Sequence, residues 1–180
     1  MLKKLEFITP TFMVVFELFL ANPMQEYHER EVIRKTEVST GSANKILRLL
    51  ADLDFLIRER KGRMIFYRLN TKDPAVQQFK IFVNVYTLRQ LLDQVKEYCR
   101  KIILFGSAAQ GTDVKESDLD LLILTSGKDS VRRKISEFNR KNERKIAPII
   151  VDANELVKLK REDKPLYGNI ERGIVLWETG

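Results

Sequence analysis

The sequence predicts an α+β protein built from two domains. Apolar residues recur at helical spacing through residues 11–53 and are followed by a strand pair. Short apolar runs typical of buried strands then lie close together after residue 98. A turn-rich segment, residues 70–74, separates the two regions. We therefore expect one domain at residues 1–74 and a second at residues 75–180.

Bulk properties limit the classes of function. The chain has 180 residues, a formal charge of +7 and a pI near 9.5, which favours an anionic partner over a merely basic protein. Cys99 is the one cysteine, so an intramolecular disulfide is excluded and a reducing cytoplasm is expected. No apolar run approaches the length of a membrane span, so we expect no contact with a membrane.

Three helices and a hairpin are expected in the first domain. Residues 11–21 are strongly apolar, residues 25–35 are polar with few apolar anchors, and residues 43–53 carry leucines at helical spacing. Residues 55–69 read as a hairpin that turns at residues 61–63. This order resembles the winged helix-turn-helix of DNA-binding regulators.

The resemblance implies double-stranded DNA as a partner, read by the third helix and held by the wing. The alternative is that these side chains are solvated surface charges on a module used for dimerisation or protein contact. The candidate DNA-binding residues are small, polar or basic, and they are Ser42, Asn44, Lys45, Arg48, Arg58, Arg60, Lys61 and Arg63.

One long helical pattern, residues 75–98, links the two domains. Its later half, residues 84–98, should pack beneath the following strand. Its earlier half contains Phe79 and Phe82, and is richer in aromatic residues than a free linker requires. Packing between the domains and a homodimer seam are both consistent with this composition.

The most informative stretch is residues 101–124. Residues 102–105 form a short apolar strand that ends at Gly106 and Ser107, and Asp118 and Asp120 lie in the next apolar strand. Residues i and i+2 of a strand share a face, so these carboxylates should lie side by side, roughly 6–7 Å apart at Cα. Adjacent carboxylates resist burial unless a cation lies between them, so we expect Mg²⁺ or Mn²⁺ here.

The Gly106–Ser107 turn offers backbone N–H groups and a hydroxyl suited to phosphate. Two better-known phosphate motifs do not apply. A P-loop needs lysine after Gly111, where this chain has Thr112, and the dinucleotide fingerprint needs glycine at position 108, which is alanine.

An apolar strand, Gly-Ser, a ten-residue spacer and Asp-Leu-Asp preceded by Ser117 together resemble the minimal nucleotidyltransferases of the DNA polymerase beta superfamily. The resemblance covers about the last eighty residues. It implies metal-dependent transfer of a nucleoside monophosphate from a nucleoside triphosphate to an unknown acceptor. Gly106, Ser107 and Ser117 would contact the phosphates, and Asp118 and Asp120 would bind the metal.

Two departures from that family affect the expected chemistry. Active relatives usually carry a third carboxylate on the strand after the basic helix, residues 130–145. That strand, residues 146–151, has no acid, and Asp152 at its end is the nearest substitute for the third catalytic carboxylate. Gln110 stands where many relatives carry a cation.

The remaining pattern gives a helix at residues 154–162 and a closing strand at residues 173–177. We expect a small mixed sheet with helices on one side. Two alternatives to the enzyme stay open. One is a DNA-binding regulator whose degenerate domain only binds nucleotide. The other is an antitoxin-like protein that pairs with a small helical toxin-like protein.

Overall fold

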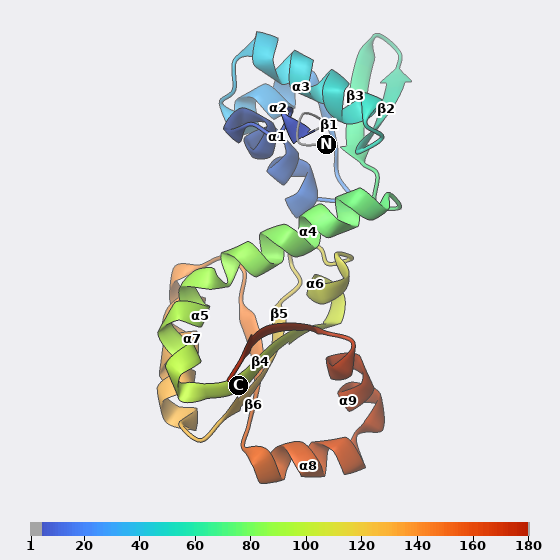
Figure 1. Cartoon of the computed structure of the whole chain (residues 1–180). Helices are drawn as coiled ribbons and strands as arrows, with labels where there is room; N and C mark the ends of the chain where they lie inside the picture. Colours follow the sequence, from blue (N-terminus) through green and yellow to red (C-terminus); the bar gives the residue numbers. More distant parts are fainter. Residues whose placement is uncertain (1–4, 180) are drawn as a thin grey trace. The chain divides into compact units, whose positions relative to one another are not determined.

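A computed structural model describes residues 5–179 and divides into two compact units, with the division between Gln77 and Gln78 (Figure 1). Each unit has its own sheet, so the predicted α+β class is confirmed. No helix within residues 5–179 is long and apolar enough to span a membrane.

The N-terminal unit has three helices and a three-stranded antiparallel sheet in the order β1-β3-β2. Phe12, Phe16 and Phe19 of the first helix are fully buried and form its core. The bounds of its elements are α1 Pro10–Ala21, β1 Glu26–His28, α2 Glu29–Thr36, α3 Thr40–Asp52, β2 Leu56–Lys61 and β3 Met64–Leu69.

The second predicted helix begins later than the sequence pattern indicates. Tyr27 is buried in β1 and pairs with Tyr67 of β3. Because this aromatic side chain is buried against the sheet, residues 26–28 form a strand and not the start of the helix. His28 then caps α2: its Nδ1 accepts from the N–H of Arg30 at 3.2 Å, and Glu31 accepts from the N–H of His28 at 3.1 Å.

The antiparallel pair of β2 and β3 confirms the predicted hairpin. Gly62 and Arg63 form its two-residue turn, and Gly62 has a φ of +63°. Tight hairpin turns need this left-handed conformation, which glycine adopts without steric cost.

The C-terminal unit contains a four-stranded mixed sheet in the order β6-β5-β4-β7, in which only β5 and β6 run parallel. The helix α4 crosses the division between the units. The bounds are α4 Pro74–Thr87, α5 Arg89–Val95, η2 Lys96–Tyr98, β4 Cys99–Phe105, α6 Gly106–Gln110, β5 Leu119–Thr125, α7 Lys128–Lys141, β6 Ile146–Val151, α8 Ala153–Glu162, α9 Lys164–Glu171 and β7 Ile174–Glu178.

The single helix expected at residues 75–98 is interrupted. The N–H of Leu88 donates to the carbonyl of Val85 at 3.2 Å, a tight i to i−3 turn that separates α4 from α5. After this turn, α5 buries Leu91 and Val95 in the core against the sheet. A straight continuation of α4 would not have to place these two side chains there.

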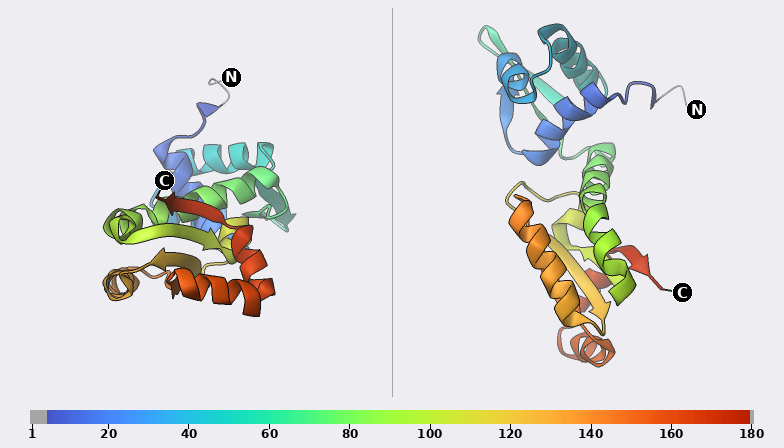
Figure 2. Two further views of the ribbon diagram at one scale, coloured as in Figure 1. Left: turned by 60° about the horizontal axis from the view of Figure 1, so that its bottom comes forward. Right: turned by 90° about the vertical axis from the view of Figure 1, so that its left-hand side faces the viewer.

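Helices cover both faces of this sheet, so the expectation of helices on one side is wrong (Figure 2). One face packs on α5 and α7 through residues such as Leu91 and Ile135. The other packs on α8 and α9 through Leu156 and Ile170. The sequence pattern predicted α8 but no helix at the position of α9, and together these helices form the second layer.

Candidate nucleotide and metal site

Gly106 brings the end of β4 against Asp120. Phe105 and Asp120 are register partners in the antiparallel pair of β4 and β5. Gly106 has a φ of +69°, and a Cβ at this position would overlap the carboxylate oxygen Oδ2 of Asp120. Glycine is therefore required both by the backbone conformation and by the close approach to Asp120.

The Gly106–Ser107 segment is the start of the short helix α6 rather than an open turn. Ser107 is half-buried, and no side chain caps the helix at Phe105. The first N–H groups of a helix have no partner inside the helix, so these donors suit a phosphate oxygen. Gln110, where relatives carry a cation, is exposed in the same short helix.

Asp118 and Asp120 lie at the start of β5, but only Asp120 belongs to the strand. The strand begins at Leu119, so the expectation that both carboxylates lie within one strand is corrected. Asp118 is exposed and Asp120 is half-buried. Burial raises the pKa of Asp120, and the nearby negative charge of Asp118 raises this pKa further.

The donor set of this pair fits a divalent cation with two protein carboxylates. Within residues 5–179, no group of three or more histidine, cysteine, aspartate or glutamate side chains is arranged to hold a metal. Hard cations accept phosphate and water oxygens as further ligands, so Mg²⁺ or Mn²⁺ would share its coordination with the nucleotide.

The structure does not bring Asp152 to the pair. In the parallel register, Asp120 lies beside Ala147 while Leu124 lies beside Val151, so Asp152 follows the opposite end of β6. Asp152 caps α8 and accepts a hydrogen bond from Lys128 Nζ at 2.9 Å, and this bond lowers the pKa of Asp152. Alanine occupies the position beside Asp120, so within residues 5–179 no third carboxylate joins the pair.

Ser117, the third predicted phosphate contact, is half-buried in the loop before β5. Its Oγ accepts a hydrogen bond from the N–H of Val114 at 3.1 Å. Its carbonyl accepts from Arg144 Nε at 2.9 Å. Ser117 therefore shapes the loop that leads to Asp118.

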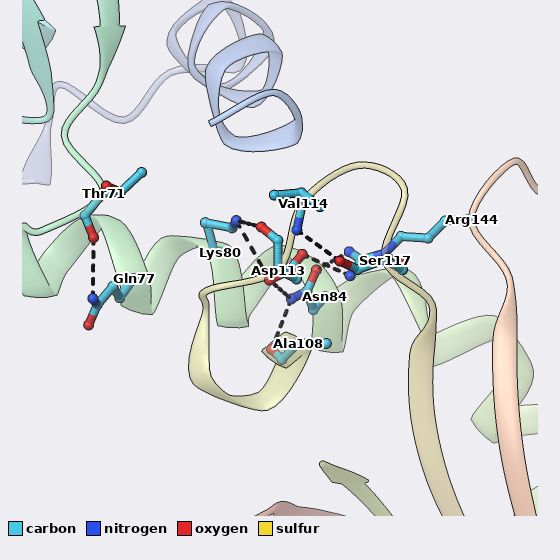
Figure 3. Close-up of polar contacts among 9 residues, drawn as sticks. All are labelled: Thr71, Gln77, Lys80, Asn84, Ala108, Asp113, Val114, Ser117 and Arg144. Atoms are coloured by element: carbon cyan, nitrogen blue, oxygen red, sulfur yellow. Dashed lines mark hydrogen bonds and ion pairs between the residues drawn. The ribbon is translucent and has the colours of Figure 1, made fainter. Parts of the chain in front are cut away.

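A buried polar cluster, which the sequence patterns did not reveal, holds this loop (Figure 3). We call Lys80, Asn84, Asp113 and Arg144 the loop-anchoring cluster. Lys80, Asn84 and Asp113 are each less than 5% exposed. Lys80 Nζ donates to the carbonyl of Asp113 and lies 3.7 Å from its carboxylate. Burial lowers the pKa of Lys80.

Asn84 and Arg144 connect the Lys80–Asp113 pair to α6 on one side of the site and to the loop before β5 on the other. Asn84 Nδ2 donates to the carbonyl of Ala108 in α6 at 2.9 Å and to Asp113 Oδ1 at 3.1 Å. Arg144 Nη1 donates to Asn84 Oδ1 at 2.6 Å, and Nη2 lies 2.8 Å from Asp113 Oδ2, an ion pair whose N–H is poorly aligned for a hydrogen bond. The cluster fixes the spacer between Ser107 and Asp118.

One residue in the sequence pattern signals this cluster. Asn84 is a polar residue in an apolar helical pattern, where an unpaired amide would be costly. Its partners could not be identified, because Asp113 and Arg144 are 29 and 60 residues away in the chain.

The predicted DNA-binding residues lie on two elements of the N-terminal unit. Ser42, Lys45 and Arg48 are exposed on α3 at three-residue spacing, which places them on one face. The basic residues of β2, β3 and their turn are also exposed. Lys61 differs from the others because it forms ion pairs with Glu26 and Glu59, so less of its charge is free for phosphate. Asn44, also on α3, is half-buried.

Comparison with known proteins identifies the C-terminal half. Residues 88–175 match the family described as the nucleotidyltransferase domain. This match spans β4, α6 and β5, which carry Gly106, Ser107 and Asp120. This part of the C-terminal unit is therefore similar to nucleotidyltransferase domains. No curated protein matches the chain.

Two solved structures align with this chain at low sequence identity. A Sulfolobus solfataricus protein assigned as a candidate nucleotidyltransferase is 14% identical, and the alignment covers 57% of this chain and 87% of that one, with a TM-score of 0.38. TrmBL2, an archaeal chromatin protein with a novel mode of DNA binding, is 13% identical. The alignment covers 93% of this chain and 76% of that one, with a TM-score of 0.34.

Proposed function

We propose that the nucleotidyltransferase domain transfers a nucleoside monophosphate from a nucleoside triphosphate to an acceptor, with Mg²⁺ or Mn²⁺ as cofactor. The observation that carries this proposal is the contact of Gly106 with the Asp120 carboxylate. It joins the N–H groups at the start of α6, which suit phosphate, to the carboxylate pair, which suits a metal.

Asp118 and Asp120 would hold the cation, and Ser107 with the first N–H groups of α6 would bind the outer phosphates. When bound, the cation supplies positive charge that offsets the carboxylates and the charge developing on the phosphates. An acceptor hydroxyl oxygen forms a bond to the α-phosphorus, the bond from that phosphorus to the bridging oxygen breaks, and pyrophosphate leaves. The hydroxyl proton passes to solvent. Positioning and charge stabilisation account for most of such catalysis.

The N-terminal unit is proposed to bind double-stranded DNA. Its support is the exposed basic hairpin together with the exposed polar face of α3, a combination that suits phosphate contact and base contact. The full proposal is a nucleotidyltransferase coupled to a DNA-binding winged-helix domain.

Ala147 favours a second candidate function. Because an alanine stands beside Asp120 where relatives carry the third carboxylate, the site can retain nucleotide binding while turnover is weak. In that case the chain is a DNA-binding regulator that senses a nucleotide.

One assay separates the two candidates. The chain is incubated with cell lysate, Mg²⁺ or Mn²⁺, and labelled ATP, GTP, CTP or UTP in turn. The enzyme proposal expects label on an acceptor with the wild type and none with Asp118→Ala/Asp120→Ala. Metal-dependent nucleotide binding without label transfer supports the regulator. Equal nucleotide affinity in the wild type and the double variant contradicts the site itself.

A further inference from the structure

A pocket of about 230 Å³ lies between the sheet of the C-terminal unit and the helices α8 and α9. One wall comes from β4, β5 and β7 through Ile103, Leu122 and Val175. The opposite wall includes Tyr167 and Ile170 of α9. Figure 1 shows α8 and α9 on this face of the sheet.

The pocket adjoins the candidate site along the same sheet face. Leu122 follows Asp120 at i+2 in β5, so both side chains lie on the face that packs on α8 and α9. Leu122 pairs with Ile103, and the next pair on the same face of the sheet, two residues along each strand, is Phe105 with Asp120. One such step is about 6.7 Å, so a ligand with phosphates at Asp120 can reach the pocket.

The size and lining of the pocket fit one flat ring system. Its volume is below the ~300–1,000 Å³ of pockets that enclose drug-sized ligands, so a whole nucleotide would not fit. The aliphatic side chains of Ile103, Leu122 and Val175 and the aromatic ring of Tyr167 provide surfaces for the faces of a ring. Glu171 provides a polar group for its edge, whereas Lys101 Nζ is paired with Glu178 at 2.9 Å.

We propose that this pocket is the nucleobase subsite of the nucleotide whose phosphates bind at Gly106, Ser107 and the carboxylate pair. Tyr167 and Val175 then set how tightly the base is held, and Glu171 contributes to the choice of base through hydrogen bonds to its edge. This inference rests on the proposed function, because the phosphates must be anchored at Asp118 and Asp120.

The test compares a probe that carries the triphosphate alone with probes that add a nucleoside to it. Inorganic tripolyphosphate with Mg²⁺ reports on the phosphate contacts alone, while ATP, GTP, CTP and UTP with Mg²⁺ report on both subsites. Val175→Trp fills the pocket from a position that is 49% exposed on a strand, where tryptophan is well tolerated. Val157→Trp is the matched control, because Val157 is 52% exposed on α8 and does not line the pocket.

By calorimetry, Val175→Trp should weaken the preferred nucleotide about 10-fold or more and leave tripolyphosphate affinity unchanged, since stacking contributes about 1–3 kcal/mol per base. Val157→Trp should change neither. Tyr167→Ala, which removes the ring without filling the pocket, should weaken the nucleotide in the same selective way. Circular dichroism spectra matching the wild type exclude misfolding as the cause.

Three outcomes overturn the inference. An unchanged nucleotide affinity in both pocket variants overturns the subsite alone and leaves the proposed function intact. Loss of label transfer with unchanged nucleotide affinity assigns the pocket to the acceptor instead. If the wild type binds neither tripolyphosphate nor any nucleotide with Mg²⁺, the proposed function and the subsite fail together.

Discussion

At the residue scale, the surroundings of Asp120 disfavour the charged form of its carboxyl group. It is half-buried beside Gly106, and both burial and the charge of Asp118 raise its pKa. A raised pKa means that the folded chain resists the ionised form of this carboxyl. At a candidate metal site, such an unfavourable charge is typical of a residue that serves function and lowers the stability of the fold.

Asp120→Asn should therefore raise the thermal midpoint near neutral pH in the absence of metal. Because the folded pKa lies above the unfolded value, the cost of ionised Asp120 is fully present above the folded pKa and disappears as pH falls toward the unfolded pKa. The difference in thermal midpoint between Asp120→Asn and the wild type should disappear as the pH falls between these two pKa values. Thermal melts across pH, with chelator present, measure it.

Asp129→Asn is the control for this experiment, because the Asp129 side chain is 92% exposed. It should show no comparable gap. Added Mg²⁺ and nucleotide should stabilise the wild type and leave Asp120→Asn unchanged. A variant that is less stable than the wild type at every pH contradicts the environment assigned to Asp120.

At the scale of elements, the loop between α6 and β5 is ordered by residues from three separate parts of the chain. Lys80 and Asn84 come from α4, Asp113 from the loop itself, and Arg144 from the segment before β6. Asp113 carries one negative charge between two cations, so its removal leaves buried polar groups without a partner.

Asp113→Ala should lower the free energy of unfolding of the C-terminal unit by about 3–5 kcal/mol, the usual cost of breaking a buried ion pair. Trp177 is the one tryptophan of the chain and lies in β7, so urea titration followed by its fluorescence reports on this unit alone. Glu143→Ala is the matched control. It breaks an exposed ion pair with Lys115, where Glu143 is 88% exposed, and should cost little. Equal losses in both variants would contradict the anchoring role.

At the scale of the whole molecule, the charge of +7 is distributed over both units. The N-terminal hairpin contributes an exposed basic strip, in which Arg60 donates to the carbonyl of its own turn at Gly62 and Arg63 stands at the tip. The C-terminal unit has its own basic helix, α7, with Arg132 and Arg133 exposed. Net charge alone therefore does not identify the nucleic-acid surface.

Arg60→Ala/Arg63→Ala should weaken duplex DNA binding for all sequences and reduce the slope of log affinity against log salt by about 1–2, because each lost phosphate contact removes ~0.9 of slope. Fluorescence anisotropy at several salt concentrations measures this. Arg132→Ala/Arg133→Ala removes the same charge from α7 and should have a much smaller effect. If the two double variants behave alike, DNA binding reflects net charge and not the wing.

The sequence by itself determined the elements that depend on local pattern. The hairpin at Gly62 and the apolar strands around residues 102–105 and 119–124 follow from side-chain periodicity and from glycine at a turn. The Gly-Ser and Asp-Leu-Asp motifs also carried the resemblance to nucleotidyltransferases, which the family match over residues 88–175 supports.

Only the tertiary structure decided which distant residues complete the site. Asp152 directly follows β6, which pairs with the strand that holds Asp120. The parallel register places Asp120 beside the start of β6 and Asp152 beyond its other end. The composition of a single strand does not reveal this register. The cluster of Asn84, Asp113 and Arg144 likewise depends on packing between elements far apart in the chain. The pocket beneath α9 exists because helices cover the second face of the sheet, an arrangement set by burial of both faces of β4 and β5.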